Sequence, residues 1–380
     1  MSREEPVLVT KSTMPPLQEV VKLLEGVWER AYLTNNGPLL QQFERLIAAR
    51  NGVADAVAVA NGTLAIELLL EAFDIKGEVI TTPFTFPATA TAICRAGAEP
   101  VFVDIDPETW NIDPQAVERA ITPNTTAILG VHVFGRPCDV RRLERIAKTN
   151  HLRLIYDAAH ANFVRTQGKS IFEWGDASSV SFHATKLFHT SEGGACFSPD
   201  PEIRAKIRRL RNFGYGANAR LTEVGTNAKM MEFAAAVGIV NLRRVDSVIE
   251  SRRRLYRLYK ERLAGIDSLA FQKIDGDETN FGYFPVVFPS EEILLRVIQE
   301  LNQKNIFPRR YFWPLLSDMT PFAEASSSSL AVAKTVSSRI VCLPFYPDMG
   351  EDVVGEICDT IRQFVSPAAL SNGNSFLAKC

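Results

Sequence analysis

From about Ala56 onward, short runs of apolar and β-branched residues alternate with longer stretches in which apolar residues recur every three or four positions. The runs include AVAVA, EVITTP, PVFVDI, TAILGVHVF, RLIYD and ASSVSF, and the stretches between them include TLAIELLLEAF, PATATAICRAG and DVRRLERIAKTN. Near-continuous apolar strands separated by helices are typical of a mostly parallel sheet that is covered on both faces. The pattern therefore predicts an α/β fold that binds its ligands at the carboxyl ends of the strands.

Around Met230 the pattern changes. A long helical run, MMEFAAAVGIVNLRRVDSVIESRRRLYRLYKERL, is followed by a mixed segment with several strands flanked by proline. The change predicts a large domain over residues 1–240 and a smaller α+β domain over residues 241–366. Residues 367–380, the end of SPAALSNGNSFLAKC, are expected to form a weakly ordered tail.

A group of arginines lies in this helical run and raises the question of nucleic-acid binding. The apolar residues of the same run fall on the opposite side of the helix. The arginines are therefore interpreted as a solvated face, and no nucleic-acid partner is expected. They are Arg252, Arg253, Arg254 and Arg257.

The composition mainly excludes classes of partner and site. A formal net charge of -2 and a charged fraction of 23% describe an ordinary globular protein without a long-range attraction to nucleic acid or anionic lipid. The six cysteines show no C-x-x-C pair, so neither a disulfide framework nor a metal site is expected. The start, MSREEP, is polar, and no stretch reaches the roughly 18 apolar residues of a membrane span. A cytoplasmic enzyme without a membrane partner is expected.

Candidate chemistry gathers where three of the apolar runs end. Gly62 and Thr63 follow AVAVA and open a helix, where free N–H groups can bind phosphate. Asp157 ends LIYD, and a buried carboxylate needs a cation or a strong donor. Lys186 follows VSFHAT, and burial favours the neutral, nucleophilic form of its amine.

Each signal also has an ordinary structural explanation. Thr63 or Asp157 could cap a helix, Lys186 could lie at the surface, and Phe86 of TPFTFPATATA could belong to the core. Neither G-x-G-x-x-G nor G-x-x-x-x-G-K-[ST] occurs, which argues against a dinucleotide fold and a Walker loop.

One ligand, pyridoxal 5'-phosphate, needs all three groups at neighbouring strand ends. Its phosphate suits a helix N-terminus, its ring nitrogen stays protonated beside an anion, and its aldehyde condenses with a lysine amine. Phe86 would lie where an aromatic ring can stack on the cofactor. The residues themselves thus indicate a pyridoxal phosphate enzyme, with pyridoxamine 5'-phosphate as the aminated form of the cofactor.

A series of motifs resembles the DegT/StrS-type nucleotide-sugar aminotransferases. In family order these are YLTNNGP, NGTLAIEL, TPFTFPATATAI, PVFVDID, VHVFGRPCD, DAAH, SFHATK, EGGA, GTNAKMMEFAAA and LPFY. They extend from about Leu33 to about Pro347, so the resemblance covers most of the chain. It implies fold type I of the pyridoxal phosphate enzymes, with a large, mostly parallel seven-stranded sheet and a smaller C-terminal domain.

Carried over position by position, the resemblance assigns the catalytic roles to two residues. Lys186 would bind the cofactor aldehyde covalently, and Asp157 would pair with the ring nitrogen. Asn227 would reach the cofactor phosphate of the other subunit, so that a homodimer shares its active sites. The implied cofactor-binding set is Gly62, Thr63, Phe86, Asp157, His160, Ser181, Lys186 and Asn227, and the implied substrate-binding set is Asn35, Asn36, Lys229 and Phe312.

Two positions depart from the family pattern. Many members carry glutamine in place of His160 and arginine in place of Lys229. The imidazole would lie near the 3'-oxygen of the cofactor, and its ability to donate a hydrogen bond is expected to depend on pH. Lys229 offers a point charge where arginine offers a planar fork, so it would hold an anion less directionally.

Within the family, YLTNNGP, DAAH and FHATKLFHTSEGG are most similar to enzymes that aminate C4 of a dTDP-4-keto-6-deoxyhexose. The expected reaction takes the amino group of L-glutamate, releases 2-oxoglutarate, and converts dTDP-4-keto-6-deoxyglucose to dTDP-4-amino-4,6-dideoxyglucose for deoxyamino sugar biosynthesis. A 3-keto sugar, a UDP-linked sugar and an inosose are alternative substrates. A pyridoxal phosphate-binding regulatory protein is the alternative from another functional class.

Overall fold

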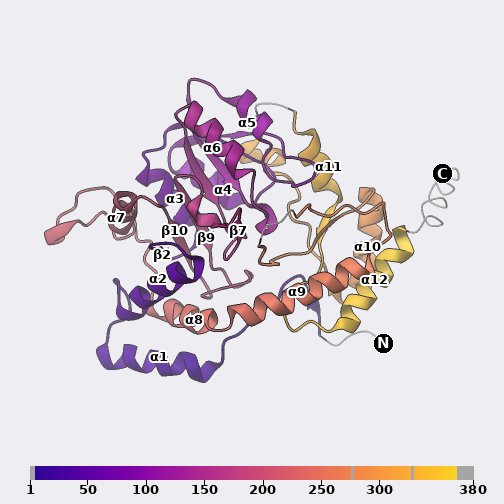
Figure 1. Ribbon diagram of the computed structural model, residues 1–380, viewed down its shortest axis with the longest axis horizontal. Coiled ribbons are helices and arrows are strands. Elements are labelled where there is room, and N and C mark those ends of the chain that lie inside the picture. Colours follow the sequence, from indigo (N-terminus) through magenta and orange to yellow (C-terminus); the bar gives the residue numbers. More distant parts are fainter. Residues whose placement is uncertain (1–4, 275–277, 327–328, 366–380) are drawn as a thin grey trace.

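The computed structural model describes residues 5–274, 278–326 and 329–365, so the expected tail at 367–380 lies outside the described residues. Figure 1 shows an elongated molecule, with a large unit built around a sheet and a smaller unit at the other end. No helix within these ranges is both long and apolar enough to cross a membrane.

The large unit is built on a seven-stranded sheet with strand order β2-β10-β9-β6-β5-β3-β4. β10 is antiparallel to its two neighbours, and the other strand pairs are parallel. The mostly parallel seven-stranded sheet expected from the sequence is thereby confirmed. The strands are β2 (Val57–Val59), β3 (Gly77–Thr81), β4 (Ala98–Phe102), β5 (Thr125–Val131), β6 (Arg153–Asp157), β9 (Ala177–Ser181) and β10 (Gly194–Phe197).

Helices cover both faces of this sheet, which explains why most of its strand residues are buried. Apolar residues of α3, α4 and α7 pack on one face, and those of α2, α5, α6 and α8 pack on the other. The outermost helix, α1 (Leu17–Arg30), lies against α8. The bounds of the covering helices are α2 (Pro38–Asn51), α3 (Gly62–Ala72), α4 (Pro87–Arg95), α5 (Pro114–Ala120), α6 (Val140–Thr149), α7 (Pro201–Leu210) and α8 (Glu232–Leu242).

The small unit has its own apolar core. Short strands β11 (Pro285–Val287) and β13 (Ile340–Cys342) pair in antiparallel fashion. β1 (Val7–Leu8) pairs in parallel with β12 (Ile306–Phe307), so the start of the chain packs with the C-terminal unit. The expected division of the chain at residue 240 assigns this segment to the large domain. The helices of this part of the chain are α9 (Val245–Arg262), α10 (Glu291–Gln303), α11 (Ala331–Arg339) and α12 (Glu351–Val365).

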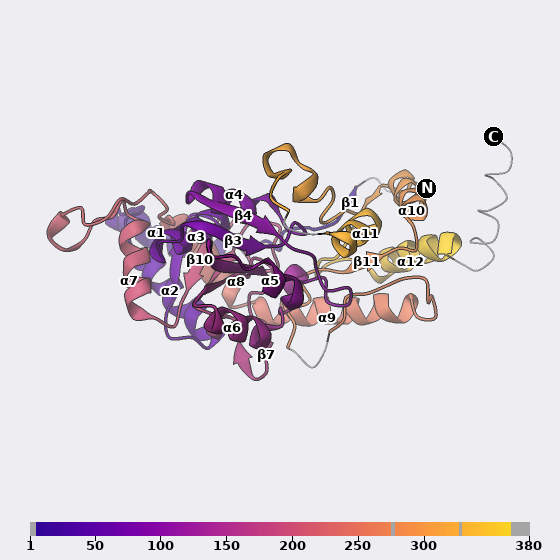
Figure 2. The same cartoon turned by 90° about the horizontal axis from the view of Figure 1, so that it is seen from above.

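The helical run after Met230 forms two helices, α8 and α9, and α9 extends from the large unit into the small one (Figures 1 and 2). The interpretation of its arginines as a solvated face is wrong for Arg252, which is only 2% exposed. Its guanidinium donates hydrogen bonds to the carbonyl oxygens of Gly282 and Phe345, because the chain returns over this side of α9.

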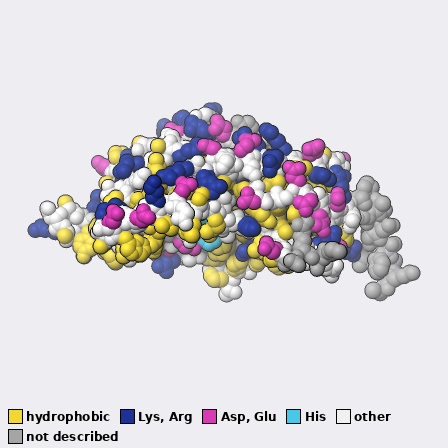
Figure 3. All heavy atoms as spheres, turned by 90° about the horizontal axis from the view of Figure 1, so that it is seen from below, with side chains coloured by type: hydrophobic (Ala, Val, Ile, Leu, Met, Phe, Trp, Pro, Cys, Tyr) yellow, Lys and Arg dark blue, Asp and Glu magenta, His cyan; other side chains and the backbone are white. Residues whose placement is uncertain are grey.

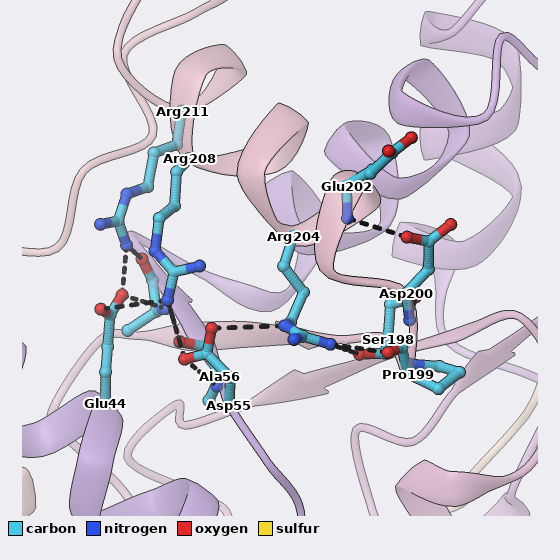
Figure 4. A network of polar contacts seen from close by, with 11 residues as sticks. Glu44, Asp55, Ala56, Ser198, Pro199, Asp200, Glu202, Arg204, Arg208 and Arg211 are labelled. Atoms are coloured by element: carbon cyan, nitrogen blue, oxygen red, sulfur yellow. Dashed lines mark hydrogen bonds and ion pairs between the residues drawn. The ribbon is translucent and has the colours of Figure 1, made fainter.

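A network of ion pairs joins α2, α7 and the start of β2 (Figure 4). Glu44 of α2 accepts from the guanidinium of Arg211 and, at 2.9 Å, from the backbone N–H of Ala58. Asp55 accepts from Arg204 at 3.3 Å and from Arg208 at 2.8 Å. Glu44 and Arg211 are buried, so this pair fixes α2 and α7 against the edge of the sheet.

Candidate active site

A pocket of about 360 Å³ opens at the carboxyl ends of β2, β6 and β9. The order of the strands in the sheet brings these ends together although they are far apart in sequence. The pocket wall contains eight of the residues expected at the site. They are Gly62, Thr63, Phe86, Asp157, His160, Ser181, Lys186 and Phe312.

Asp157 ends β6 with a buried carboxylate. Oδ2 accepts a hydrogen bond from the Thr89 hydroxyl at 2.9 Å, and Oδ1 accepts one from the Ala159 N–H at 3.0 Å. Burial raises the pKa of Asp157, while these two hydrogen bonds and the charge of Lys186 act in the opposite direction. A buried carboxylate that faces a pocket and has a raised pKa is suited to meet a cationic ligand group.

Lys186 follows β9 and is partly buried. Burial lowers the pKa of its amine, although the neighbouring Asp157 and Tyr311 favour the ammonium. Nζ lies 3.2 Å from the hydroxyl oxygen of Tyr283. The amine thus has a larger neutral fraction than that of a solvated lysine, as a nucleophile or a proton acceptor requires.

His160 departs from the expectation that its donor state depends on pH. Its Nδ1 accepts a hydrogen bond from the backbone N–H of Phe134 at 3.1 Å. Burial and the charge of Lys186 lower the pKa of the imidazole well below its usual range. The ring is therefore neutral at physiological pH, with its proton on Nε2, and it can donate from Nε2 throughout that range.

The helix start at Gly62 forms a cradle with the end of β9. Asn61 caps α3, because its side chain accepts from the N–H of Leu64 at 2.9 Å. A Cβ atom on Gly62 would lie 2.9 Å from Cβ of Ser181, so only glycine lets the strand end come this close. Free N–H groups and the Ser181 hydroxyl together suit a phosphate. With Asp157 and Lys186 in the same pocket, the residues fit pyridoxal phosphate.

Four expected residues do not line this pocket. Asn227 is exposed and accepts a hydrogen bond from Nζ of Lys229 at 2.6 Å. Nζ of Lys229 lies 4.5 Å from the ring centre of Phe213. Asn35 and Asn36 are also exposed, and Oδ1 of Asn36 accepts from Arg211 at 3.2 Å. These residues form a group on the surface of the large unit.

The pocket also contains residues that sequence reasoning missed. Three of them, Tyr283, Arg309 and Tyr311, come from the small unit. The sequence pattern indicated site residues at the strand ends of the large sheet, so it did not identify these three. The guanidinium of Arg309 stacks on the ring of Tyr311 at 5.0 Å. Thr89, whose hydroxyl donates to Asp157, lies within TPFTFPATATA. Its position one helical turn after Phe86 could have identified it from the sequence as a residue near the site.

Residues 17–362 match the DegT/DnrJ/EryC1/StrS aminotransferase family. The chain belongs to this family. A family relative from Shigella dysenteriae, dTDP-4-amino-4,6-dideoxy-D-glucose transaminase, is 40% identical over 95% of this chain and 99% of its own. The Escherichia coli protein of the same description is 36% identical over 93% of this chain and 97% of its own.

The fold comparison agrees with the sequence comparison. The crystal structure of DesI in the presence of its TDP-sugar product superposes with a TM-score of 0.92 and 34% identity, covering 98% of this chain and 96% of that one. The resemblance read from the motifs is confirmed, as is the fold type I architecture of pyridoxal phosphate-dependent aminotransferases.

Proposed function

We infer that this protein transfers the amino group of L-glutamate to the 4-keto group of a nucleotide-linked 6-deoxy sugar. The sugar proposed is dTDP-4-keto-6-deoxyglucose, because the Shigella and Escherichia coli relatives are named for its amino product. The observation that carries the proposal is one pocket in which the buried carboxylate of Asp157, the amine of Lys186 and the start of α3 converge. A deoxyamino sugar for a surface polysaccharide such as the O-antigen of lipopolysaccharide would be the downstream use.

The residues of the pocket divide the work between binding and chemistry. Gly62, Thr63 and Ser181 would hold the cofactor phosphate, and Phe86 would stack on the ring. Asp157 would keep the ring nitrogen protonated, and Nε2 of His160 would donate to the 3'-oxygen. When bound, pyridoxal phosphate supplies an electron sink for the electrons released at Cα of the amino donor.

Lys186 has two tasks in this proposal. Its amine binds the cofactor before the amino donor arrives, and the freed Nζ then takes up and returns the proton of the donor's Cα. Both tasks need a neutral amine, which the burial of Lys186 favours. The second half-reaction uses the same groups in reverse order to aminate the sugar.

Arg309 is the residue proposed to attract the anionic part of a substrate. Its cation lines the pocket, and no carboxylate within the described ranges forms an ion pair with it. Glutamate brings carboxylates and a nucleotide sugar brings a diphosphate, and a guanidinium binds either group in bidentate geometry.

A homodimer with shared sites is proposed for the residues that lie outside the pocket. Asn227 and Lys229 are close in sequence to Val224, which is 88% exposed, and to Met231, which is 55% exposed. Hydrophobic side chains gather at the end of the molecule seen at the left of Figure 3. Exposed apolar surface of this kind is typical of a subunit interface. A partner packed there would receive Asn227 and Lys229 at its own pocket.

The test measures release of 2-oxoglutarate from glutamate with a panel of dTDP- and UDP-linked 3-keto and 4-keto sugars and an inosose. We expect the greatest kcat/KM with dTDP-4-keto-6-deoxyglucose. Lys186→Ala should abolish turnover, and borohydride reduction with pyridoxal phosphate should attach the cofactor to Lys186. Turnover only with another sugar would contradict the substrate assignment. A regulatory protein would bind the cofactor but release no 2-oxoglutarate.

A further inference from the structure

The buried Arg252 is the starting point, because an arginine without an anion is costly to bury. Its Nη1 donates to the carbonyl oxygens of Gly282 at 3.1 Å and Phe345 at 3.0 Å. The guanidinium also lies 5.5 Å from the ring centre of Phe345. Burial lowers the pKa of Arg252 to about 10, and within the described residues it forms no ion pair with a carboxylate. Its contacts fix the backbone of Gly282 to α9.

The same segment is fixed to the large unit by Asn280, which is 2% exposed. Its Nδ2 donates to the carbonyl oxygens of His160 at 2.8 Å and Asn162 at 2.9 Å. Its Oδ1 accepts from the N–H of Gly282 at 2.9 Å. Residues 280–282 are therefore held from both units. They are hydrogen-bonded to the loop that carries His160, and Tyr283 follows them directly in the sequence.

Tyr283 is the side chain that this anchored segment presents to the pocket. Its hydroxyl lies 3.2 Å from Nζ of Lys186, and its ring centre lies 4.6 Å from that of His160. Burial raises the pKa of Tyr283, so the phenol stays protonated. The titratable and charged groups around it are Lys186, His160, Tyr311, Arg252, Arg309 and Cys342.

We propose that the Tyr283 hydroxyl holds the free amine of Lys186 in the orientation needed for proton transfer, and that Asn280 and Arg252 position Tyr283. The proposal rests on the aminotransferase function, in which Nζ takes up and returns the proton of the donor's Cα. A protonated Nζ donates to the phenol oxygen, and a neutral Nζ accepts from the phenol O–H. The phenol keeps its own proton in both states, so no proton is gained or lost at Tyr283.

The first test measures the pKa of Lys186 in the full-length, cofactor-free protein, by acetic anhydride labelling at a series of pH values and peptide mapping. A hydrogen bond from an ammonium is stronger than one to a neutral amine, so Tyr283→Phe should lower this pKa by about half a unit to one unit. The matched control is Tyr256→Phe, a change in a small-unit tyrosine that packs against Phe281 and Phe284. This variant should leave the pKa of Lys186 unchanged. An unchanged pKa in Tyr283→Phe overturns the proposal.

The positioning role has its own variant. Asn280→Ala alters no charge and should lower the pKa of Lys186 in the same direction as Tyr283→Phe. The double variant should match Tyr283→Phe alone, because Asn280 acts only through Tyr283. A further decrease in the double variant would show that Asn280 acts by another route and would overturn its assignment.

A kinetic measurement links the contact to the reaction. Glutamate deuterated at Cα should show a larger isotope effect on single-turnover bleaching in Tyr283→Phe than in the wild type, with bleaching about tenfold slower. Equal rates and equal isotope effects would overturn the role of Tyr283. A wild-type protein that glutamate does not bleach would contradict the proposed function. The labelling experiment needs no turnover, so it tests the contact between Tyr283 and Lys186 independently of that function.

Discussion

At the scale of single residues, the pocket depends on side chains whose charge state is set by burial. Asp157 and Lys186 are close enough for their charges to influence each other, yet burial shifts the pKa of each toward its neutral form. A cationic ring nitrogen beside Asp157 would restore the carboxylate. The pocket is thus electrostatically suited to a ligand that carries a positive charge next to Asp157.

Asp157→Asn should retain the cofactor but lower kcat by about 100-fold to 1000-fold, because a neutral amide cannot hold the ring nitrogen protonated. The measurement is steady-state kinetics with glutamate, together with cofactor absorbance after gel filtration. Asp113→Asn, a change at the N-cap of α5, is the matched control and should have normal kcat. Near-normal kcat in Asp157→Asn would remove the role assigned to this carboxylate.

Two histidines whose pKa is lowered in the folded chain, the buried His132 and the partly buried His160, predict a loss of stability in acid. Burial lowers the pKa of His132 to about 3 and that of His160 well below its usual range. The unfolded chain binds protons at these sites below about pH 6.5, whereas the folded chain does not, so stability falls as pH decreases from 6.5. His132 should remove about 1 kcal/mol from the unfolding free energy between pH 6.5 and 5.5, and His160 acts in the same direction.

Urea unfolding of His132→Gln at these two pH values checks this expectation. The variant should lose about 1 kcal/mol less than the wild type over the same interval. His151→Asn, a change at an exposed residue, should lose as much as the wild type. Identical losses in His132→Gln and the wild type would mean that His132 is not the group that titrates.

At the scale of elements, the sheet edge at β2 is held by α2 and α7 through charged groups. The pair of Glu44 and Arg211 is buried (Figure 4). Arg211 also donates to Asn36 in the loop before α2. Removing one partner of a buried pair leaves an uncompensated charge. This edge should therefore respond to substitution far more strongly than the exposed helix surfaces.

Glu44→Ala should lower the unfolding free energy by about 3–5 kcal/mol, because Arg211 would remain buried without its carboxylate. Glu67→Ala removes the partner of Arg95, whose side chain is 66% exposed, and should cost less than about 1 kcal/mol. Urea unfolding of both variants decides between these expectations. Equal effects would indicate that water already compensates the charge of Arg211.

At the scale of the whole molecule, the prediction concerns the proposed shared site. Lys186→Ala and Asn227→Ala, if each is inactive alone, should regain part of the activity when mixed under conditions that allow subunit exchange. A mixed dimer would contain one site with both native residues and one site with neither. The measurement is 2-oxoglutarate release alongside proof of exchange by mass spectrometry. No recovery despite exchange would place Asn227 in the site of its own chain.

The sequence predicted the sheet and its mostly parallel order, and it named strand-end residues that the structure brings into one pocket. This was possible because apolar runs, helical periodicity and the residues at the ends of the runs are local features. It did not predict the burial of Arg252 or the pairing of β1 with β12, because both depend on chain segments that are distant in sequence. The pH-dependent donor expected at His160 was wrong for the same reason, since the amide of Phe134 and the surrounding burial fix its proton on Nε2.

The sequence by itself determined which groups are available: a lysine, a carboxylate and a helix start, each at the end of an apolar run of one α/β pattern. Only the tertiary structure decided how those groups behave. The depth of burial sets the protonation of Asp157 and Lys186, and the packing of the small unit brings Tyr283 to within 3.2 Å of Nζ. The physical reason is that residue type and periodicity are properties of the chain, whereas desolvation and contact between distant segments exist only once the two units have packed together.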